Sequence, residues 1–318
     1  MSGLLALTGA TGFIGKHAID RLAADGWHIR ALTRRADVGR ERRADAADGI
    51  TWIHGDLDDT AALTALVDGA DAVVNAAGLI KARDHGEFDR INAAAVQRLA
   101  VIAASQASRP RMVHMSSLAA REPALSPYAA SKAAGERQLA DAAATLHWSI
   151  LRPPAVYGPG DRETLDLFRL MRHGWLPTPR PAGGRVSLIH VDDLCAALQV
   201  LLTAALPSGA IFEVDDGKRG GYGWPDVAAA GAAVFGRPVR PFGVPRGLLT
   251  GIAQINEGIA RLSRRAPMVS RGKVAELYHP DWVCRANPAL AAVGWRPRIE
   301  LVAGFRQTVE WYRRHSWL

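Results

Sequence analysis

The feature that most constrains the fold of this chain is a regular alternation, over its first half, of short apolar runs and longer stretches with helical periodicity. Residues 4–8, 28–33, 51–54, 72–75, 111–116 and 149–152 form the apolar runs, which we expect to be strands. Residues 14–24, 61–67, 91–105 and 128–146 have the helical pattern. Because the strands have no polar face, both faces of their sheet must be covered. The sequence therefore predicts an α/β fold with a doubly wound parallel sheet.

A glycine-rich turn, Thr8-Gly9-Ala10-Thr11-Gly12-Phe13-Ile14-Gly15, joins the first expected strand to the first expected helix. Gly9 allows a tight turn, Gly12 allows backbone N–H groups to approach a pyrophosphate, and Gly15 allows the helix to pack closely on the sheet. The helix N-terminus offers free N–H groups and a positive dipole end to an anion. The turn predicts a dinucleotide site, with contacts from Gly9, Thr11, Gly12, Phe13, Ile14 and Gly15.

The residues after the second strand discriminate between the two nicotinamide cofactors. A site selective for NAD places a carboxylate there for the ribose 2′-hydroxyl. This chain has Arg34 and Arg35 instead, with no carboxylate before Asp37. An arginine pair binds a 2′-phosphate through charge-assisted hydrogen bonds, so we expect NADP(H) to be preferred over NAD(H). Further cofactor contacts are expected from the carboxyl ends of the third and fourth strands, at Asp56, Leu57, Ala76, Ala77 and Gly78.

A third pattern lies around Tyr128 and Lys132. Ser126 and Pro127 are typical of a helix start, and residues four apart share a helix face. An ammonium beside a phenol favours the phenolate, which would let Tyr128 exchange a proton while hydride moves to or from the nicotinamide. Lys132 would also bind the nicotinamide ribose. Ser117, after the preceding strand, would bind the substrate oxygen.

Together these motifs resemble the extended short-chain dehydrogenase/reductases, the superfamily of nucleotide-sugar epimerases, dehydratases, dihydroflavonol-type reductases and 3β-hydroxysteroid dehydrogenases. The resemblance extends over nearly the whole chain and includes residues 152–160, 189–193, 294–297 and 308–312. It implies a Rossmann-type sheet and a catalytic triad of Ser117, Tyr128 and Lys132. It also implies that Asn92 orders the active-site wall and that Pro153 caps the nicotinamide pocket, and we add Ser116 and Lys132 to the expected cofactor contacts.

Departures from the subfamily patterns bear on the reaction. Ser117 is followed by Leu118-Ala119-Ala120, whereas dehydratases have an Asp-Glu pair there, so the chain lacks the acid and base for dehydration. Residues 161–165 hold no asparagine of the kind that binds the diphosphate in the epimerases. The expected activity is hydride transfer that interconverts a carbonyl and an alcohol with NADP(H). A nucleotide-sugar epimerase is the alternative, in which Arg185, Arg237 and Arg240 would bind a diphosphate.

The chain is expected to form two structural regions. Residues 1–160, together with about 186–215, should form the NADP(H)-binding domain, and residues 161–185 and 216–318 a smaller, helix-rich substrate lobe. The proline-rich segments 153–160 and 177–181 are interpreted as turns. Residues 246–265 contain a stripe of apolar residues flanked by arginines, which predicts an amphipathic helix. We expect the stripe to pack on the substrate lobe; contact with an anionic membrane or a protein partner is the alternative.

The remaining sequence properties set broader limits. A formal charge of +8 fits anionic ligands, but no motif indicates nucleic-acid binding. Cys195 and Cys284 are far apart and show no metal-ligand spacing, so we expect no metal site and a reducing, cytoplasmic location. The partners expected are a small-molecule substrate and, from the resemblance, a second copy in a homodimer. A regulator that binds NADP(H) without turnover is the non-enzymatic alternative, which the complete Ser-Tyr-Lys set disfavours.

Overall fold

The computed structural model describes residues 3–35, 49–181, 183–263 and 266–318. Its centre is a seven-stranded sheet in which every neighbouring pair is parallel. The strands are β1 (Leu4–Thr8), β2 (His28–Thr33), β3 (Ile50–His54), β4 (Ala72–Asn75), β5 (Arg111–Met115), β6 (Trp148–Arg152) and β11 (Ala210–Glu213), in the spatial order β11-β6-β5-β4-β1-β2-β3. This is the doubly wound Rossmann-type sheet that the alternating pattern predicts.

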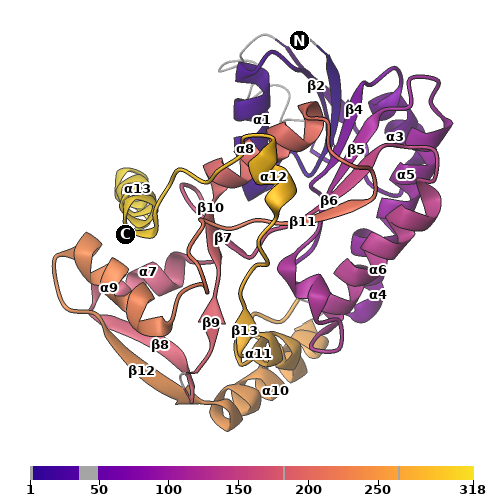
Figure 1. Cartoon of the computed structure of the whole chain (residues 1–318). Helices are drawn as coiled ribbons and strands as arrows, with labels where there is room; N and C mark the ends of the chain where they lie inside the picture. Colours follow the sequence, from indigo (N-terminus) through magenta and orange to yellow (C-terminus); the bar gives the residue numbers. More distant parts are fainter. Residues whose placement is uncertain (1–2, 36–48, 182, 264–265) are drawn as a thin grey trace.

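Helices cover both faces of this sheet, as the apolar strands require (Figure 1). The helices α1 (Phe13–Ala24), α8 (Val191–Thr203) and α12 (Pro288–Ala292) contribute buried side chains to the core on one face. The helices α3 (Thr60–Val67), α5 (Ala95–Ser105) and α6 (Pro127–Ala142) contribute to the core on the other. Asp59 caps α3 through its side chain, and Ser126 and Pro127 begin α6 as the sequence predicts.

A smaller lobe lies beyond the carboxyl ends of the central strands (Figure 1). A separate apolar core joins α7 (Leu165–Arg172), α9 (Trp224–Phe235) and α13 (Leu301–Arg314). Its aromatic centre consists of Tyr157, Phe168, Phe305 and Tyr312, whose rings meet edge to face. The lobe also contains α10 (Arg246–Ser263) and α11 (Arg271–Leu277). Short parallel pairs connect it to the sheet domain: β7 (Ala155–Tyr157) with β10 (Leu188–His190), and β9 (Arg185–Val186) with β13 (Asp281–Trp282).

The proline-rich segments differ from the expectation of turns. Residues 175–180 form β8 (Trp175–Arg180), which pairs in parallel with β12 (Arg240–Pro245). Prolines are tolerated here because Pro177 and Pro179 are two residues apart, so both missing N–H groups lie on the edge of β8 that faces away from β12. A strand also forms in the other proline-rich segment, where β7 begins directly after Pro153 and Pro154.

The stripe on α10 also differs from the expectation. Leu248, Ile252, Ile255, Ile259 and Leu262 share one face of this helix, as predicted, but that face is turned to solvent. The buried face consists of small side chains, Ala253 and Ala260. The periodicity identifies the residues that share a face, but it does not determine which face of the helix packs on the protein. Arg264 and Arg265, at the end of the predicted 246–265 segment, lie outside the described residues.

Candidate active site

The glycine turn has the geometry of an anion cradle. Gly9 has a φ of +74°, and a Cβ there would lie 2.5 Å from the backbone of Ala76. A Cβ on Gly15 would lie 2.1 Å from the carbonyl oxygen of Gly9, so only glycine lets α1 approach the turn. Gly12 is exposed and precedes α1 with no side-chain cap, which leaves the first N–H groups of the helix available to a ligand. These residues fit a dinucleotide pyrophosphate.

The strand order brings the other expected cofactor residues to the same edge. The strands β4 and β2 flank β1, so Ala76 and Ala77 follow one neighbour of the glycine turn and Arg34 and Arg35 follow the other. Both arginines are exposed. The carboxylate of Asp56 accepts hydrogen bonds from the N–H groups of Asp58 and Asp59, at 2.8 and 3.1 Å, and so shapes the loop after β3. Leu57 lies in that loop, where its carbonyl oxygen accepts from Arg98.

The first turns of α6 bring the expected catalytic residues together. The side chain of Ser117 lies close enough to Tyr128 to lower the pKa of the phenol, and the ring of Phe88 lies 6.1 Å from that of Tyr128. Lys132 is 5% exposed, and its Nζ donates to the carbonyl oxygen of Met115 at 3.0 Å. The same Nζ would lie 3.0 Å from a Cβ on Gly78. The ammonium therefore lies between the ends of β4 and β5, beside the strand that carries the glycine turn.

The ionisation of Tyr128 differs from the sequence-based expectation. Burial raises the pKa of Tyr128 to about 12, the neighbouring Ser117 side chain opposes the rise, and the charge of Glu276 adds to it. Burial also lowers the pKa of Lys132 to about 8, although the charge of Glu136 opposes that shift. The expected lowering of the phenol pKa by the Lys132 ammonium is not among the effects on Tyr128, and desolvation is the largest of those effects. At neutral pH Tyr128 is a protonated phenol, which suits it to donate a proton.

Hydrogen bonds of Asn92, Ser116 and Pro153 fix the segments around this site. Asn92 lies in a single π-helical turn, Arg90–Ala94, and its amide accepts from the N–H of Leu79 at 2.8 Å and donates to the carbonyl of Leu79 at 2.9 Å. Its amide also donates to Ser131, which fixes the loop after β4 to the catalytic helix. Ser116 is buried and donates to Glu136. The carbonyl oxygen of Pro153 accepts from Leu118 at 2.8 Å, beside Ser117.

The sequence reasoning missed two carboxylates that act on this site. Glu136, one helical turn beyond Lys132, is 6% exposed and accepts from Arg152 at 2.8 Å. Glu276 on α11 is also 6% exposed and accepts from Ser126, the N-cap of α6. The spacing of four from Lys132 to Glu136 is a usable sequence signal. Nothing local connects Glu276 with Ser126, which is 150 residues away.

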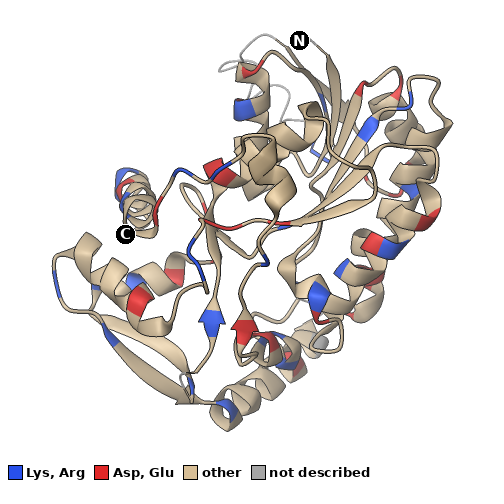
Figure 2. Ribbon diagram, in the orientation of Figure 1, with Lys and Arg blue, Asp and Glu red and all other residues tan. Residues whose placement is uncertain are grey.

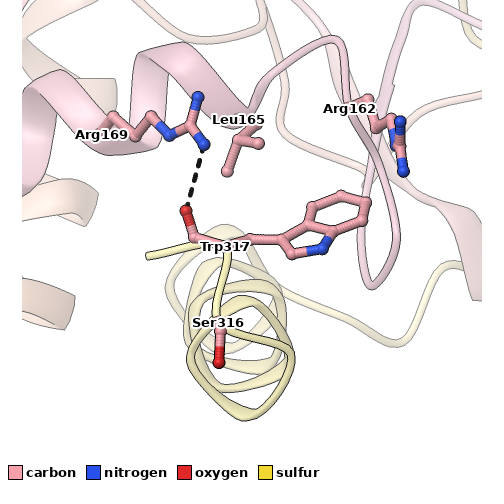
Figure 3. A pocket seen from close by; sticks show the side chains of 5 residues that line it. All are labelled: Arg162, Leu165, Arg169, Ser316 and Trp317. Atoms are coloured by element: carbon pink, nitrogen blue, oxygen red, sulfur yellow. Dashed lines mark hydrogen bonds between the residues drawn. The ribbon is translucent and has the colours of Figure 1, made fainter.

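Two hollows of about 260 Å³ lie in the smaller lobe. The first lies between the start of α7 and the C-terminal residues (Figure 3). There Arg162 stacks 4.9 Å from the ring centre of Trp317, and Arg169 donates to the carbonyl of Trp317, so these arginines hold the chain end. The second is mainly apolar and is lined by Pro179, Pro181, Gly183, Gly184, Val186, Trp224, Leu277, Tyr278, His279 and Pro280. Because Leu277 follows Glu276, one end of α11 lines this second cavity while Glu276 contacts the catalytic helix.

Comparison with known proteins agrees with this geometry. Residues 5–214 match the model of the NAD dependent epimerase/dehydratase family. The chain belongs to this family. It is therefore a member of the extended short-chain dehydrogenase/reductase superfamily and an enzyme of nicotinamide-dependent oxidoreduction or epimerisation.

Individual relatives include both reductases and epimerase-like structures. The chain is 40% identical over 317 residues to the ceramide reductase of Caulobacter vibrioides, across 99% of this chain and 96% of that protein. It is 26% identical to the 2-alkyl-3-oxoalkanoate reductase of Stenotrophomonas maltophilia, across 95% and 97% of the two chains. Among solved structures, MoeE5 in complex with UDP-glucose and NAD superimposes with a TM-score of 0.73 at 23% identity, across 99% of both chains. That structural likeness concerns the fold.

Proposed function

We propose that this protein is an NADP(H)-dependent oxidoreductase that interconverts a ketone and an alcohol on a substrate with long apolar chains. One observation carries the proposal: Tyr128 and the buried Lys132 lie in the first turns of α6, next to Ser117, at the sheet edge where the glycine turn opens. A regulator without turnover would have no use for this combination of a protonated phenol and a buried ammonium.

Arg34 and Arg35 support the choice of NADP(H). They follow β2, the neighbour of β1, and therefore stand beside the turn that would bind the pyrophosphate. Exposed guanidinium groups at this place fit the 2′-phosphate in charge and in hydrogen-bond geometry. Gly9, Gly12 and the uncapped start of α1 would bind the pyrophosphate, and Gly78, Asn92, Lys132 and Pro153 would surround the nicotinamide end.

The residues divide the reaction between them. The cofactor supplies or accepts the hydride. In the direction of reduction Tyr128, held protonated by burial, donates its proton to the substrate oxygen as the alcohol forms. Ser117 donates a hydrogen bond that polarises the same oxygen. Lys132, with a pKa near 8, orients the cofactor ribose and is poised to return a proton to Tyr128.

The relatives and the second cavity support the substrate class. The printed names of the two related reductases describe a ceramide and a 2-alkyl-3-oxoalkanoate, both of which have alkyl chains. In this chain the cavity at the end of α11 is lined mainly by proline, glycine, valine, leucine and aromatic side chains, together with His279. The indole N–H of Trp224 in that wall is buried and has no hydrogen-bond partner within the described part of the chain.

The epimerase alternative has less support in this chain. Arg185 already donates to the carbonyl oxygens of Gly220 and Gly221, and Arg237 donates to that of Arg172. Two of the three arginines expected to bind a diphosphate thus already form hydrogen bonds with backbone carbonyl groups of this chain. Arg240 lies exposed on β12.

The cofactor proposal is tested by titrating wild-type protein and the Arg34→Ala variant with NADPH and NADH, with bound nicotinamide fluorescence as the readout. We expect wild-type protein to bind NADPH more tightly and the variant to lose roughly tenfold or more in NADPH affinity, because one charged hydrogen-bonding group is removed. NADH affinity should be unchanged. Equal losses for both cofactors would contradict 2′-phosphate recognition, and a panel of long-chain ketones and alcohols then tests the reaction.

A further inference from the structure

The exposed α10 stripe, which consists of Leu248, Ile252, Ile255, Ile259 and Leu262, plays no part in the proposed chemistry. These side chains are between 41% and 90% exposed, although all five are large and apolar. Single exposed apolar residues are ordinary on protein surfaces, but five along one helix face form a continuous apolar surface. Figure 2 shows α10 as a mostly uncharged ribbon at the end of the molecule opposite the N-terminus.

The sequence that contains the stripe is rich in basic residues. Residues 240–273 contain seven basic residues and one acidic residue: Arg240, Arg246, Arg261, Arg264, Arg265, Arg271 and Lys273 against Glu257. Of the described side chains, Arg246, Arg271 and Lys273 are exposed, and Lys273 forms an ion pair with Glu276 at 3.2 Å. The single carboxylate of α10 is bound by Arg271 at 2.9 Å. An apolar stripe bordered by positive charge has the character of a helix that lies in the headgroup layer of an anionic membrane.

The position of the stripe connects it with the second cavity. The strand β12 leads directly into α10, and Tyr278 in the cavity wall donates a hydrogen bond to Val244 of β12. The helix α11, which ends in the cavity wall, packs against α10. The helix α11 therefore connects α10, which carries the stripe, with the cavity and with Ser126 at the start of the catalytic helix.

We propose that the α10 stripe docks the substrate lobe on an anionic lipid bilayer, from which the enzyme takes its long-chain substrate. This inference rests on the proposed function for the nature of the substrate. Charge favours lipid over a second copy of the chain, because a symmetric dimer through this face would have the excess of basic residues on both sides of its interface. No described helix is long and apolar enough to cross a bilayer.

Co-sedimentation with vesicles tests the docking. Wild-type protein is compared with Ile255→Asp/Ile259→Asp, on vesicles of phosphatidylcholine alone and of phosphatidylcholine with phosphatidylglycerol. Val101→Asp is the matched control, because Val101 is 53% exposed on α5, in the other domain. We expect wild-type and control protein to bind the anionic vesicles, more weakly at about 0.5 M salt. The double variant should lose roughly tenfold or more in affinity, since two apolar anchors become charged.

Two results would overturn the docking: no binding of wild-type protein to anionic vesicles, or equal binding by the double variant. A wild-type dimer that becomes monomeric in the double variant and does not bind vesicles would assign the stripe to a second copy instead. NADPH-dependent reduction of a short, water-soluble ketone separates this proposal from the proposed function. The double variant should keep that activity and lose activity on a ketone lipid presented in vesicles. Vesicle binding without any ketone reduction would contradict the proposed function alone.

Discussion

At the scale of single residues, the hydrogen bonds of His17 favour its protonated form. Its Nδ1 lies 3.1 Å from a carboxylate oxygen of Asp192 and its Nε2 lies 2.8 Å from the carbonyl oxygen of Pro159. Both partners accept hydrogen bonds, so both ring nitrogens must carry a proton. Burial is the largest single effect and lowers the pKa of His17, but the hydrogen bonds to Asp192 and Pro159 and the charges of Asp192 and Asp20 together outweigh it, so the pKa is raised. The imidazolium fastens α1, just after the glycine turn, to α8 and the loop at Pro159.

This arrangement predicts a pH dependence of stability. Because the folded-state pKa of His17 lies above its unfolded value of 6.5, the contribution of His17 is fully present below pH 6.5. It is lost as the pH rises through the folded-state pKa. The free energy of unfolding of wild-type protein should therefore exceed that of His17→Gln at pH 6 by more than at pH 9, as measured by urea denaturation. A difference that grows with pH would contradict a charged His17.

At the scale of elements, the sequence predicts structure where local chemistry decides it. The glycine turn predicts the connection of β1 to α1, and Ser126 with Pro127 predicts the start of α6. The apolar runs predict the strands of the sheet. Each of these signals acts within a few residues. Two predictions are wrong: the turn expected at residues 177–181, and the packing of the α10 stripe on the substrate lobe. In both cases the outcome depends on a distant partner: β12 supplies the hydrogen bonds for β8, and the neighbours of α10 determine which face is buried.

The packing of α1 on the turn gives a prediction for Gly15. Gly15→Ala places a Cβ 2.1 Å from the carbonyl oxygen of Gly9, so the helix must move away from the turn. We expect a destabilisation of about 1–3 kcal/mol, a fall in Tm of about 2–10 °C and weaker NADPH binding. The matched control is Gly258→Ala in α10, where a Cβ meets nothing within 4 Å. That variant should be as stable as wild-type protein or more so; equal behaviour of the two variants would contradict the close packing.

At the scale of the whole molecule, the site depends on both lobes. Arg121, at the end of the short 3-10 helix after Ser117, donates to the carbonyl oxygens of Val283 at 2.9 Å and Asp281 at 2.6 Å. Glu276 binds Ser126 at the start of the catalytic helix. The triad and glycine turn could be predicted from local spacing, and their catalytic and binding roles stay predictions. Glu276 could not be predicted, because only the folded chain brings α11 against α6. The domain boundaries also stay a prediction.

The contact between lobes gives a prediction for Glu276. Glu276→Ala removes the acceptor of the Ser126 hydrogen bond in a buried place, which should cost about 1–3 kcal/mol of stability. The kcat/KM for a ketone substrate should fall while the Kd for NADPH stays unchanged, since the glycine turn is in the other lobe. Glu276→Gln keeps an acceptor and should restore part of the activity; it should also lower the pKa of Tyr128, because a charge that raises it is removed. A loss of NADPH affinity equal to the loss of kcat/KM would contradict a role confined to substrate placement.

The most direct test of the account is the turnover of Tyr128→Phe with NADPH and a long-chain ketone, measured together with the Kd for NADPH. The variant keeps the ring that contacts Phe88 and loses only the proton that we assign to the reaction. We expect turnover to fall by about 10²–10⁴-fold, with the Kd for NADPH within about twofold of wild-type protein. Turnover within about tenfold of wild-type protein would show that Tyr128 is not the proton donor.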